Sequence, residues 1–460
     1  MLIHENKEDL IMRKALALVL CGAMAVSMVG CGSSNSGKKT SDETSKKSVK
    51  LSVTTTYAGE DTNAQNYKDA VAAWESKTGN KVDDSSATSD ETFKSRITTD
   101  FETGSEPDVL FFFNGVDSNQ FVEQGKVVSV DEIRKEYPDY ASNMKDDMLG
   151  ASPVDGKNYS IPVNGFWEGM FVNKEVLKKA GVDVPTKDTT WDEFLECCEK
   201  LKSSGITPLG MGLKDGYLPA WIGIFLGQQN MDSVNDMISL MSGQESFTDK
   251  KYSEWLEKIA ELKEAGYINE DILSLDLYQG QQLIESKKAA MTLHTQPYAV
   301  SLEKSLGSDQ IGFAKAPVFG TGKFADSVAT PSQVYVIPNS AKHKEEAADF
   351  LLFLQEEDNI KYLYESANAM MPNNNFDESW VSSEIDRKVL EWQKEDNNFC
   401  YQLYFAPMFE TDGLIPTVQK MFSEGLAPKD AAVELDEALG KCMEQNPEVH
   451  DAFLEWSVEE

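Results

Sequence analysis

Aromatic, carboxylate and carboxamide side chains follow the ends of two segments that are predicted to be buried strands. Tyr57 and Glu60 close a β-rich segment, and Phe113, Asn114 and Asp117 close an apolar run. Planar rings stack on flat C–H surfaces, while carboxylates and amides hold hydroxyl groups in a fixed orientation. In α/β sheets, ligands bind beyond the carboxyl ends of the strands. We therefore expect Tyr57 and Asn114 to contact a bound solute; for Tyr57 the alternative is a loop tyrosine that reaches into solvent.

Covalent chemistry has no comparable signal in the sequence. GxSxG, HExxH, a Walker A loop and a GxGxxG at a strand–helix junction do not occur. A glycoside hydrolase would need two carboxylates about 5–9.5 Å apart, but among 77 acidic residues chance proximity says little. His294 has no acidic or cysteine partner at metal-ligand spacing, and CxxC does not occur. We expect no catalytic residue, no metal and no cofactor.

Alternating strand and helix patterns position the candidate residues. Strands are predicted at 49–57, 81–86 and 107–113, and the helices between them end at Gly79 and Gly104. This alternation predicts an α/β domain in which helices cover a largely parallel sheet. A second unit begins near Tyr159. Its expected helices lie at 191–202, 252–265, 278–287, 342–355, 414–425, 429–443 and 447–456, and its expected strands at 289–293, 311–316 and 334–337.

The first 48 residues are predicted to be a signal peptide and a tether. Arg13 and Lys14 precede an apolar run at 15–29, which is shorter than the roughly 20 residues of a membrane span. The start is Met1 or Met12. Residues 28–31 (MVGC) resemble a bacterial lipobox, so we expect cleavage after residue 30 and a lipid such as palmitate on Cys31; a soluble secreted protein is the alternative. Residues 31–48 are predicted to be a flexible linker.

The acidic composition of the chain argues against nucleic acids as partners. The 460 residues include 43 Lys+Arg and 77 Asp+Glu, a formal net charge of −34, which opposes binding to nucleic acids. Hydrophobic residues make up 41%, as in ordinary globular proteins. Six cysteines in so long a chain imply no disulfide framework, although pairing of Cys400 with Cys442 stays open.

Several segments, in order along the chain, resemble one known family. They are GSEPDV (104–109), IPV (161–163), MFVNKEVLKKAGV (170–182), TWDEF (190–194) after Pro185, GITPL (205–209), KAAM (288–291), KEEAADFL (344–351) and MP (371–372). From about residue 50 to 440 the chain resembles the extracytoplasmic solute-binding proteins of ABC importers, in the carbohydrate-binding family 1 that includes maltose-binding protein. Lys287 departs from the pattern, since glycine is commoner there.

The resemblance implies an α/β, periplasmic-binding-protein-like fold of class II type. Two lobes would be joined by crossover strands near 162–164, 293–296 and 332–336, with a ligand cleft between them and a hinge that closes on the ligand. Lobe 1 would comprise 49–163 plus 296–332, and lobe 2 would comprise 164–295 plus 333–460. The implied function is capture of a sugar and delivery to the transmembrane subunits of an ABC permease. We expect an oligosaccharide, because several aromatics suggest several stacked rings, and a monomer anchored to a Gram-positive cell membrane.

The resemblance also implies which residues line the cleft after the first crossover. Phe166, Trp167 and Glu168 follow that crossover, in a stretch that lines the cleft in the family. Trp167 is the expected stacking ring, and Glu168 is the expected hydroxyl acceptor. Successive side chains of an extended segment point to opposite faces. One of the two rings is therefore expected in the pocket and the other in the core.

Two further segments are implied by the same resemblance. Tyr298 resembles the family's aromatic residue after KAAM, with Gln296 beside it and His294 as a ligand-facing or buried polar residue. The family also makes contacts from the loop that holds Asp215 and Tyr217.

Trp221 lies in the helical turn after that loop, where packing in the core is the alternative to ligand contact.

Two other classes of protein compete with the binding-protein interpretation: a secreted glycoside hydrolase and a cell-surface adhesin. Within the binding reading, a peptide, an amino acid or a metal is the alternative ligand.

Overall fold

The computed structural model describes residues 48–59, 62–87, 91–113, 116–144, 157–163, 167–328, 333–370, 373–392, 394–395 and 404–456. The expected signal peptide and Cys31, with nearly all of the expected linker, lie outside these residues. None of the helices within the described ranges is long and apolar enough to cross a membrane.

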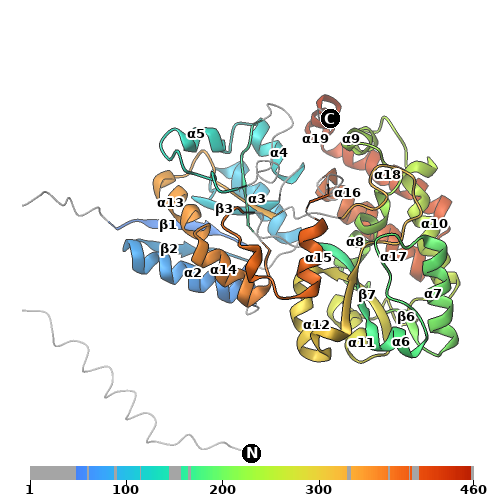
Figure 1. Ribbon diagram of the computed structural model, residues 1–460. Helices are drawn as coiled ribbons and strands as arrows, with labels where there is room; N and C mark the ends of the chain where they lie inside the picture. The colour runs from blue at the N-terminus through green and yellow to red at the C-terminus, as the bar shows by residue number, and fades with distance from the viewer. Residues whose placement is uncertain are drawn as a thin grey trace, which may run out of the picture. The chain divides into compact units, whose positions relative to one another are not determined.

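Five strands form the first sheet in the order β2-β1-β3-β9-β4. They are β1 (Lys50–Thr54), β2 (Lys81–Asp84), β3 (Val109–Phe113), β4 (Ile161–Pro162) and β9 (Gln333–Val336). β1 pairs in parallel with β2 and with β3, which confirms the predicted parallel arrangement. β9 runs antiparallel to β3 and β4. β3 is almost continuously apolar because helices cover both faces of this sheet (Figure 1).

In the described part of the chain, six helices accompany the first sheet. They are α2 (Thr62–Thr78), α3 (Glu91–Thr103), α4 (Val116–Glu123), α5 (Val130–Arg134), α13 (Lys344–Leu354) and α14 (Glu357–Ala367). α2 and α3 end where the sequence predicts, at Gly79 and Gly104, whose φ values of 76° and 70° suit glycine. α2 packs beside α14 (Figure 1), and its Trp74 ring meets Phe350 of α13 edge-on at 5.2 Å.

Four strands form the second sheet in the order β6-β7-β5-β8. They are β5 (Glu168–Asn173), β6 (Thr207–Leu209), β7 (Ala289–Thr295) and β8 (Ile311–Ala314). β5 pairs antiparallel with both β7 and β8, and only β6 and β7 are parallel. Successive residues of β5 point to opposite faces. Met170 and Val172 therefore enter one apolar core, and Phe171 enters another.

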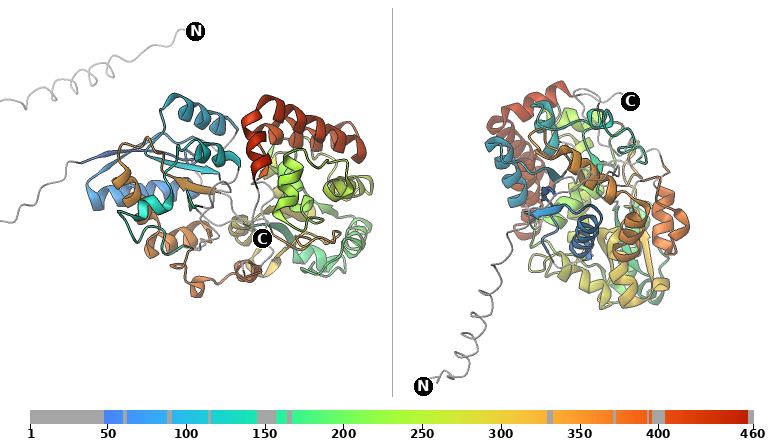
Figure 2. Two further views of the ribbon diagram at one scale, coloured as in Figure 1. Left: turned by 90° about the horizontal axis from the view of Figure 1, so that it is seen from above. Right: turned by 90° about the vertical axis from the view of Figure 1, so that its left-hand side faces the viewer.

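The first of these cores, here called the α8-side core, is covered by α6 (Lys174–Lys179), α7 (Trp191–Ser203), α8 (Tyr217–Gly227), α9 (Val234–Met241), α10 (Lys250–Glu264), α16 (Pro407–Phe409), α17 (Ile415–Ser423), α18 (Pro428–Gln445) and α19 (Pro447–Glu455). Figure 2 shows the red C-terminal helices beside the green α8–α10 segment. α7 begins at Trp191, as the predicted helix at 191–202 does, and Thr190 before it forms a reciprocal capping box with Glu193.

The second, here called the α12-side core, is built on Phe171 and Phe313. Its helices are α11 (Leu277–Glu285), α12 (Ala299–Leu306) and α15 (Glu384–Trp392). Cys442 lies buried as a free thiol in the α8-side core. Cys400 lies outside the described residues.

The expected lobe boundaries are wrong after residue 295. Residues 296–332 were expected in lobe 1, but β8 pairs with β5 in the second sheet. Residues 333–460 were expected in lobe 2, but β9 pairs with β3 and β4 in the first sheet. The reason lies in the 3₁₀ turn Gln296–Tyr298, which holds Pro297 and leads the chain through α12 back to the other edge of β5. The chain therefore leaves the second sheet between β8 and β9, not at 293–296.

Candidate functional site

Residues from two expected site segments meet where β5 begins and β7 ends. Glu168 pairs with Thr295, and Gly169 pairs with His294. Just beyond this pairing, the Gln296 N–H donates to the Trp167 carbonyl oxygen at 2.7 Å. Antiparallel pairing brings these residues together although more than a hundred positions separate them in the chain.

Two rings from different elements, those of Tyr298 and Trp221, pack against His294. The imidazole stacks on Tyr298 with ring centroids 4.5 Å apart and an interplanar angle of 19°. Trp221, from the first turns of α8, meets the same imidazole edge-on at 5.4 Å. The Tyr298 hydroxyl donates to Glu285 Oε1 at 2.6 Å. Trp221 and Tyr298 therefore approach the β7 end together.

Buried polar atoms without a partner concentrate at the same place. Within the described part of the chain these include Trp167 Nε1, Glu168 Oε2, His294 Nε2 and Gln296 Oε1, and also Asp215 Oδ1 in the loop before α8. An unmade hydrogen bond at a buried group costs about 1–3 kcal/mol. Such a concentration favours a partner from outside the chain that donates and accepts hydrogen bonds.

Burial keeps the two titratable groups at this end of the sheet uncharged near pH 7. It raises the pKa of Glu168 to about 8, and the nearby Glu410 carboxylate adds to the rise. Burial also lowers the pKa of His294 to about 3. The Thr295 N–H donates to His294 Nδ1 at 2.6 Å, which leaves the ring proton on Nε2, the atom without a partner. Neutral donors and acceptors of this kind suit hydroxyl groups.

Trp167 does not present a free stacking face. Its side chain is 3% exposed and belongs to the α12-side core, with Phe171 and Phe313. Only its indole nitrogen remains available for a hydrogen bond. Its role as a stacking partner therefore stays a prediction, and the structure favours a packing role for the ring.

One of the two carboxylate oxygens of Asp215 is held by a hydrogen bond within the protein. Its Oδ2 accepts from the Leu277 N–H at 3.0 Å, which ties the loop before α8 to the start of α11, and its Oδ1 is left without a partner. Phe166 and Asn114 lie outside the described residues, and so does the side chain of Tyr217. Their expected contacts with a solute remain predictions.

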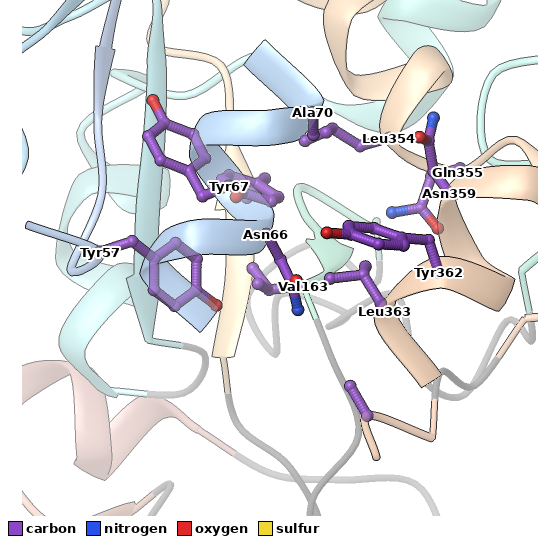
Figure 3. Close-up of a pocket in the computed structure, with 12 residues that line it drawn as sticks. Tyr57, Asn66, Tyr67, Ala70, Val163, Leu354, Gln355, Asn359, Tyr362 and Leu363 are labelled. Carbon is purple, nitrogen blue, oxygen red and sulfur yellow. The ribbon is translucent and has the colours of Figure 1, made fainter. Parts of the chain in front are cut away.

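Tyr57 belongs to a separate cavity beside the first sheet (Figure 3). α2, α14 and β9 wall this cavity, and its lining includes Tyr57, Asn66, Val163 and Tyr362. The Tyr57 ring packs edge-on against Phe111 with centroids 5.5 Å apart. Asn66 is 2% exposed; its Oδ1 accepts from Ser366 Oγ at 3.0 Å and its Nδ2 has no partner among the described residues. Tyr57 thus stands at the carboxyl end of β1, beside a buried amide donor.

Sequence reasoning missed Asn66 and Glu410. Asn66 lies within a helix, where a buried amide has no distinguishing spacing. Glu410 is the first residue of a π-helical segment, Glu410–Leu414, which no sequence pattern predicted. Within the described ranges, no group of three His, Cys, Asp or Glu side chains could hold a metal ion.

Comparison with known proteins identifies the family of this chain. The family model of the bacterial extracellular solute-binding proteins matches residues 58–361. The chain belongs to this family. The members of this family are extracellular binding proteins, and this solute-binding protein is of the same class. A relative, an uncharacterized ABC transporter extracellular-binding protein of Pyrococcus horikoshii, is 24% identical over 264 residues, 55% of this chain and 55% of that protein. The chain thus spans little more than half the length of the first curated relatives that it matches.

Two solved structures show the fold of this solute-binding protein. A chitin oligosaccharide binding protein aligns with a TM-score of 0.74 at 19% identity, over 86% of this chain and 98% of that chain. The bacterial solute receptor AcbH, described as having an exclusive substrate preference for β-D-galactopyranose, aligns with a TM-score of 0.73 at 17% identity, over 87% and 100%. The fold is therefore the two-lobed α/β fold of periplasmic solute-binding proteins, as the sequence predicts.

Proposed function

We propose that this protein is the extracytoplasmic sugar receptor of an ABC importer. It would capture an oligosaccharide between its two lobes, close around it and deliver it to the transmembrane subunits of a permease. Family membership supports the receptor role. The P. horikoshii relative is called an ABC transporter binding protein, and two structural neighbours are described as binding sugars.

The observation that supports a sugar is the β5–β7 end, where rings and unpaired neutral polar atoms occur together. His294, Tyr298 and Trp221 supply ring surface, and Glu168 Oε2, His294 Nε2 and Gln296 Oε1 lack partners among the described residues. A pyranose offers both an apolar C–H face and a rim of hydroxyls, so it matches both kinds of surface. The protein would hold the sugar without altering its covalent bonds.

Lobe 1 would comprise the first sheet with its helices, residues 48–163 and 333–370. Lobe 2 would comprise 167–328 and 373–456. Tyr57, Asn114 and Asn66 would supply contacts from lobe 1, and Phe166, Asp215 and Tyr217 would add contacts from lobe 2. The protein would act as a monomer.

Differential scanning fluorimetry and calorimetry against a panel of oligosaccharides and monosaccharides test the sugar assignment. We expect at least one sugar to raise the melting temperature and to be recovered unchanged. Released reducing ends would instead indicate a glycoside hydrolase. A flat response to every glycan, with binding of a peptide or an amino acid, would replace the sugar by that solute.

Anchoring is proposed through Cys31, after cleavage of residues 1–30. The lipobox-like MVGC sequence and the polar segment that follows support it. Labelling of cells with a clickable palmitate analogue should mark the wild type, and Cys31→Ser should lose the label and appear in the culture medium. A labelled Cys31→Ser variant would contradict the assignment.

A further inference from the structure

One buried carboxylate, Asp386 of α15, accepts three hydrogen bonds from two different parts of the chain. Gln296 Nε2 donates to its Oδ1 at 2.5 Å, Asn368 Nδ2 donates to the same oxygen at 2.9 Å, and the Tyr364 hydroxyl donates to Oδ2 at 2.8 Å. Asp386 and Gln296 are both 0% exposed. A carboxylate this deeply buried is costly unless it is hydrogen-bonded. The three donors must therefore keep their positions together.

Two of the three donors belong to α14 and its C-terminal end, and the third follows β7. Tyr364 lies on α14, which packs on α2 beside the first sheet. Asn368 ends α14 in the left-handed conformation, with φ 55° and ψ 30°, where the chain turns away from that helix. Gln296 follows β7 of the second sheet. Asp386 is thus hydrogen-bonded both to the C-terminal end of α14, through Tyr364 and Asn368, and to Gln296 after β7.

Gln296 is the member of this cluster that faces the candidate solute site. Its Nε2 also donates to the Asn368 carbonyl at 3.2 Å, so both acceptors around that nitrogen are oxygens and the amide cannot turn over. Its Oε1 is left buried without a partner within the described part of the chain. Its backbone N–H holds the Trp167 carbonyl, at the start of β5. Gln296, which is expected to contact the ligand, therefore uses its N–H donors for hydrogen bonds within the protein. Its Oε1 is the acceptor that remains for a solute.

We propose that Gln296, Asp386, Asn368 and Tyr364 form a positioning cluster that couples the solute site to the segment where the chain leaves α14. A solute hydroxyl that donates to Gln296 Oε1 would fix the amide, and the amide would fix Asp386 and its two other donors. The solute part of this inference rests on the proposed function. The coupling between the two segments rests on the hydrogen bonds alone.

Tyr364→Phe tests the coupling, and Tyr362→Phe is its matched control. Both tyrosines lie on α14 and donate to an aspartate, but Tyr362 is exposed and bonds Asp69. Hydrogen–deuterium exchange is measured without solute on peptides that cover 289–298 and 357–370. We expect Tyr364→Phe to accelerate exchange at both segments, by about fivefold or more at 289–298, and the control to leave 289–298 unchanged. Acceleration confined to 357–370 would reduce Tyr364 to a local structural role and overturn the proposal.

Asn368→Gly is the second variant, because glycine accepts the left-handed backbone and removes only the amide. It should repeat the Tyr364→Phe pattern. Should it fail to fold, Tyr364→Phe still decides, since it removes a single oxygen atom and keeps the ring.

A solute measurement separates this proposal from the proposed function. With the sugar that the wild type binds best, we expect Tyr364→Phe and Asn368→Gly to weaken binding about fivefold or more. The control for this measurement is Tyr267→Phe, which removes a hydroxyl that donates to Glu199 Oε2 at 3.0 Å away from the candidate site, and it should leave the affinity unchanged. Equal affinities for all four proteins would refute the coupling to the solute. A wild type that binds no sugar would refute the proposed function, while the exchange experiment would still decide whether the two segments are coupled.

Discussion

Replacing Glu168 by Gln should change how the stability of the protein depends on pH. Burial raises the pKa of Glu168 from 4.5 to about 8. Below pH 4.5 the folded and the unfolded chain both hold the proton. Between pH 4.5 and 8 the unfolded chain releases it and the folded chain keeps it, so stability falls as the pH rises. Above pH 8 the loss is complete.

The size of the effect follows from the two pKa values. One pKa unit corresponds to about 1.4 kcal/mol, so a group that shifts from 4.5 to about 8 loses at most about 5 kcal/mol in total. Over the range from pH 6.0 to 7.5 the largest loss is about 2 kcal/mol. The Glu168 side chain as a whole is only half-buried, so water screens part of its charge. We therefore expect about 1 kcal/mol over this range.

Urea denaturation at pH 6.0 and pH 7.5 measures this difference. The wild type should lose about 1 kcal/mol more free energy of unfolding than Glu168→Gln, because Gln stays neutral at both values. Glu264→Gln, at an exposed acid in the last turn of α10, is the control and should behave as the wild type. Glu410 and Lys94 are the charged groups near this site, with Lys94 Nζ 3.9 Å from Glu410 Oε2, and neither is altered. Equal pH dependence of the wild type and Glu168→Gln would refute the reasoning.

Three more predictions follow from the packing around the β5–β7 end. Trp167→Ala should lower the free energy of unfolding by about 3–5 kcal/mol, as for other buried aromatics; loss of sugar affinity at unchanged stability would instead place the ring in the pocket. His294→Ala should weaken sugar binding at least about tenfold in calorimetry, while wild-type affinity should show no step attributable to His294 between pH 5 and 8, because its pKa lies near 3; a step that disappears in the variant would contradict the neutral imidazole. Gly169→Ala should destabilise the protein by about 1–3 kcal/mol, since a Cβ there would lie 2.4 Å from the Phe313 ring; a thermal melt like that of the wild type would show that the ring can move.

Much of the local structure was predictable because it depends on neighbouring residues. The apolar run at 107–113 became β3, and the amphipathic segment at 191–202 became α7. In the structure, Trp221 and Tyr298 both contact His294. Their contact through His294 could not be derived from spacing, because α8 and β7 are brought together only by the packed sheet.

The sequence alone determined the class of fold, the positions of most helices and strands, and the family, because hydrophobic periodicity, caps and short motifs are local properties of the chain. Only the tertiary structure decided which of the two sheets the strands after residue 295 join. The 296–332 segment returned to the second sheet because β8 found its hydrogen-bond partners on β5. Tertiary packing also buried the Trp167 ring and drew the Gln296 amide onto Asp386. Strand pairing and buried hydrogen bonds join residues far apart in the chain, and no local pattern specifies which of them will meet.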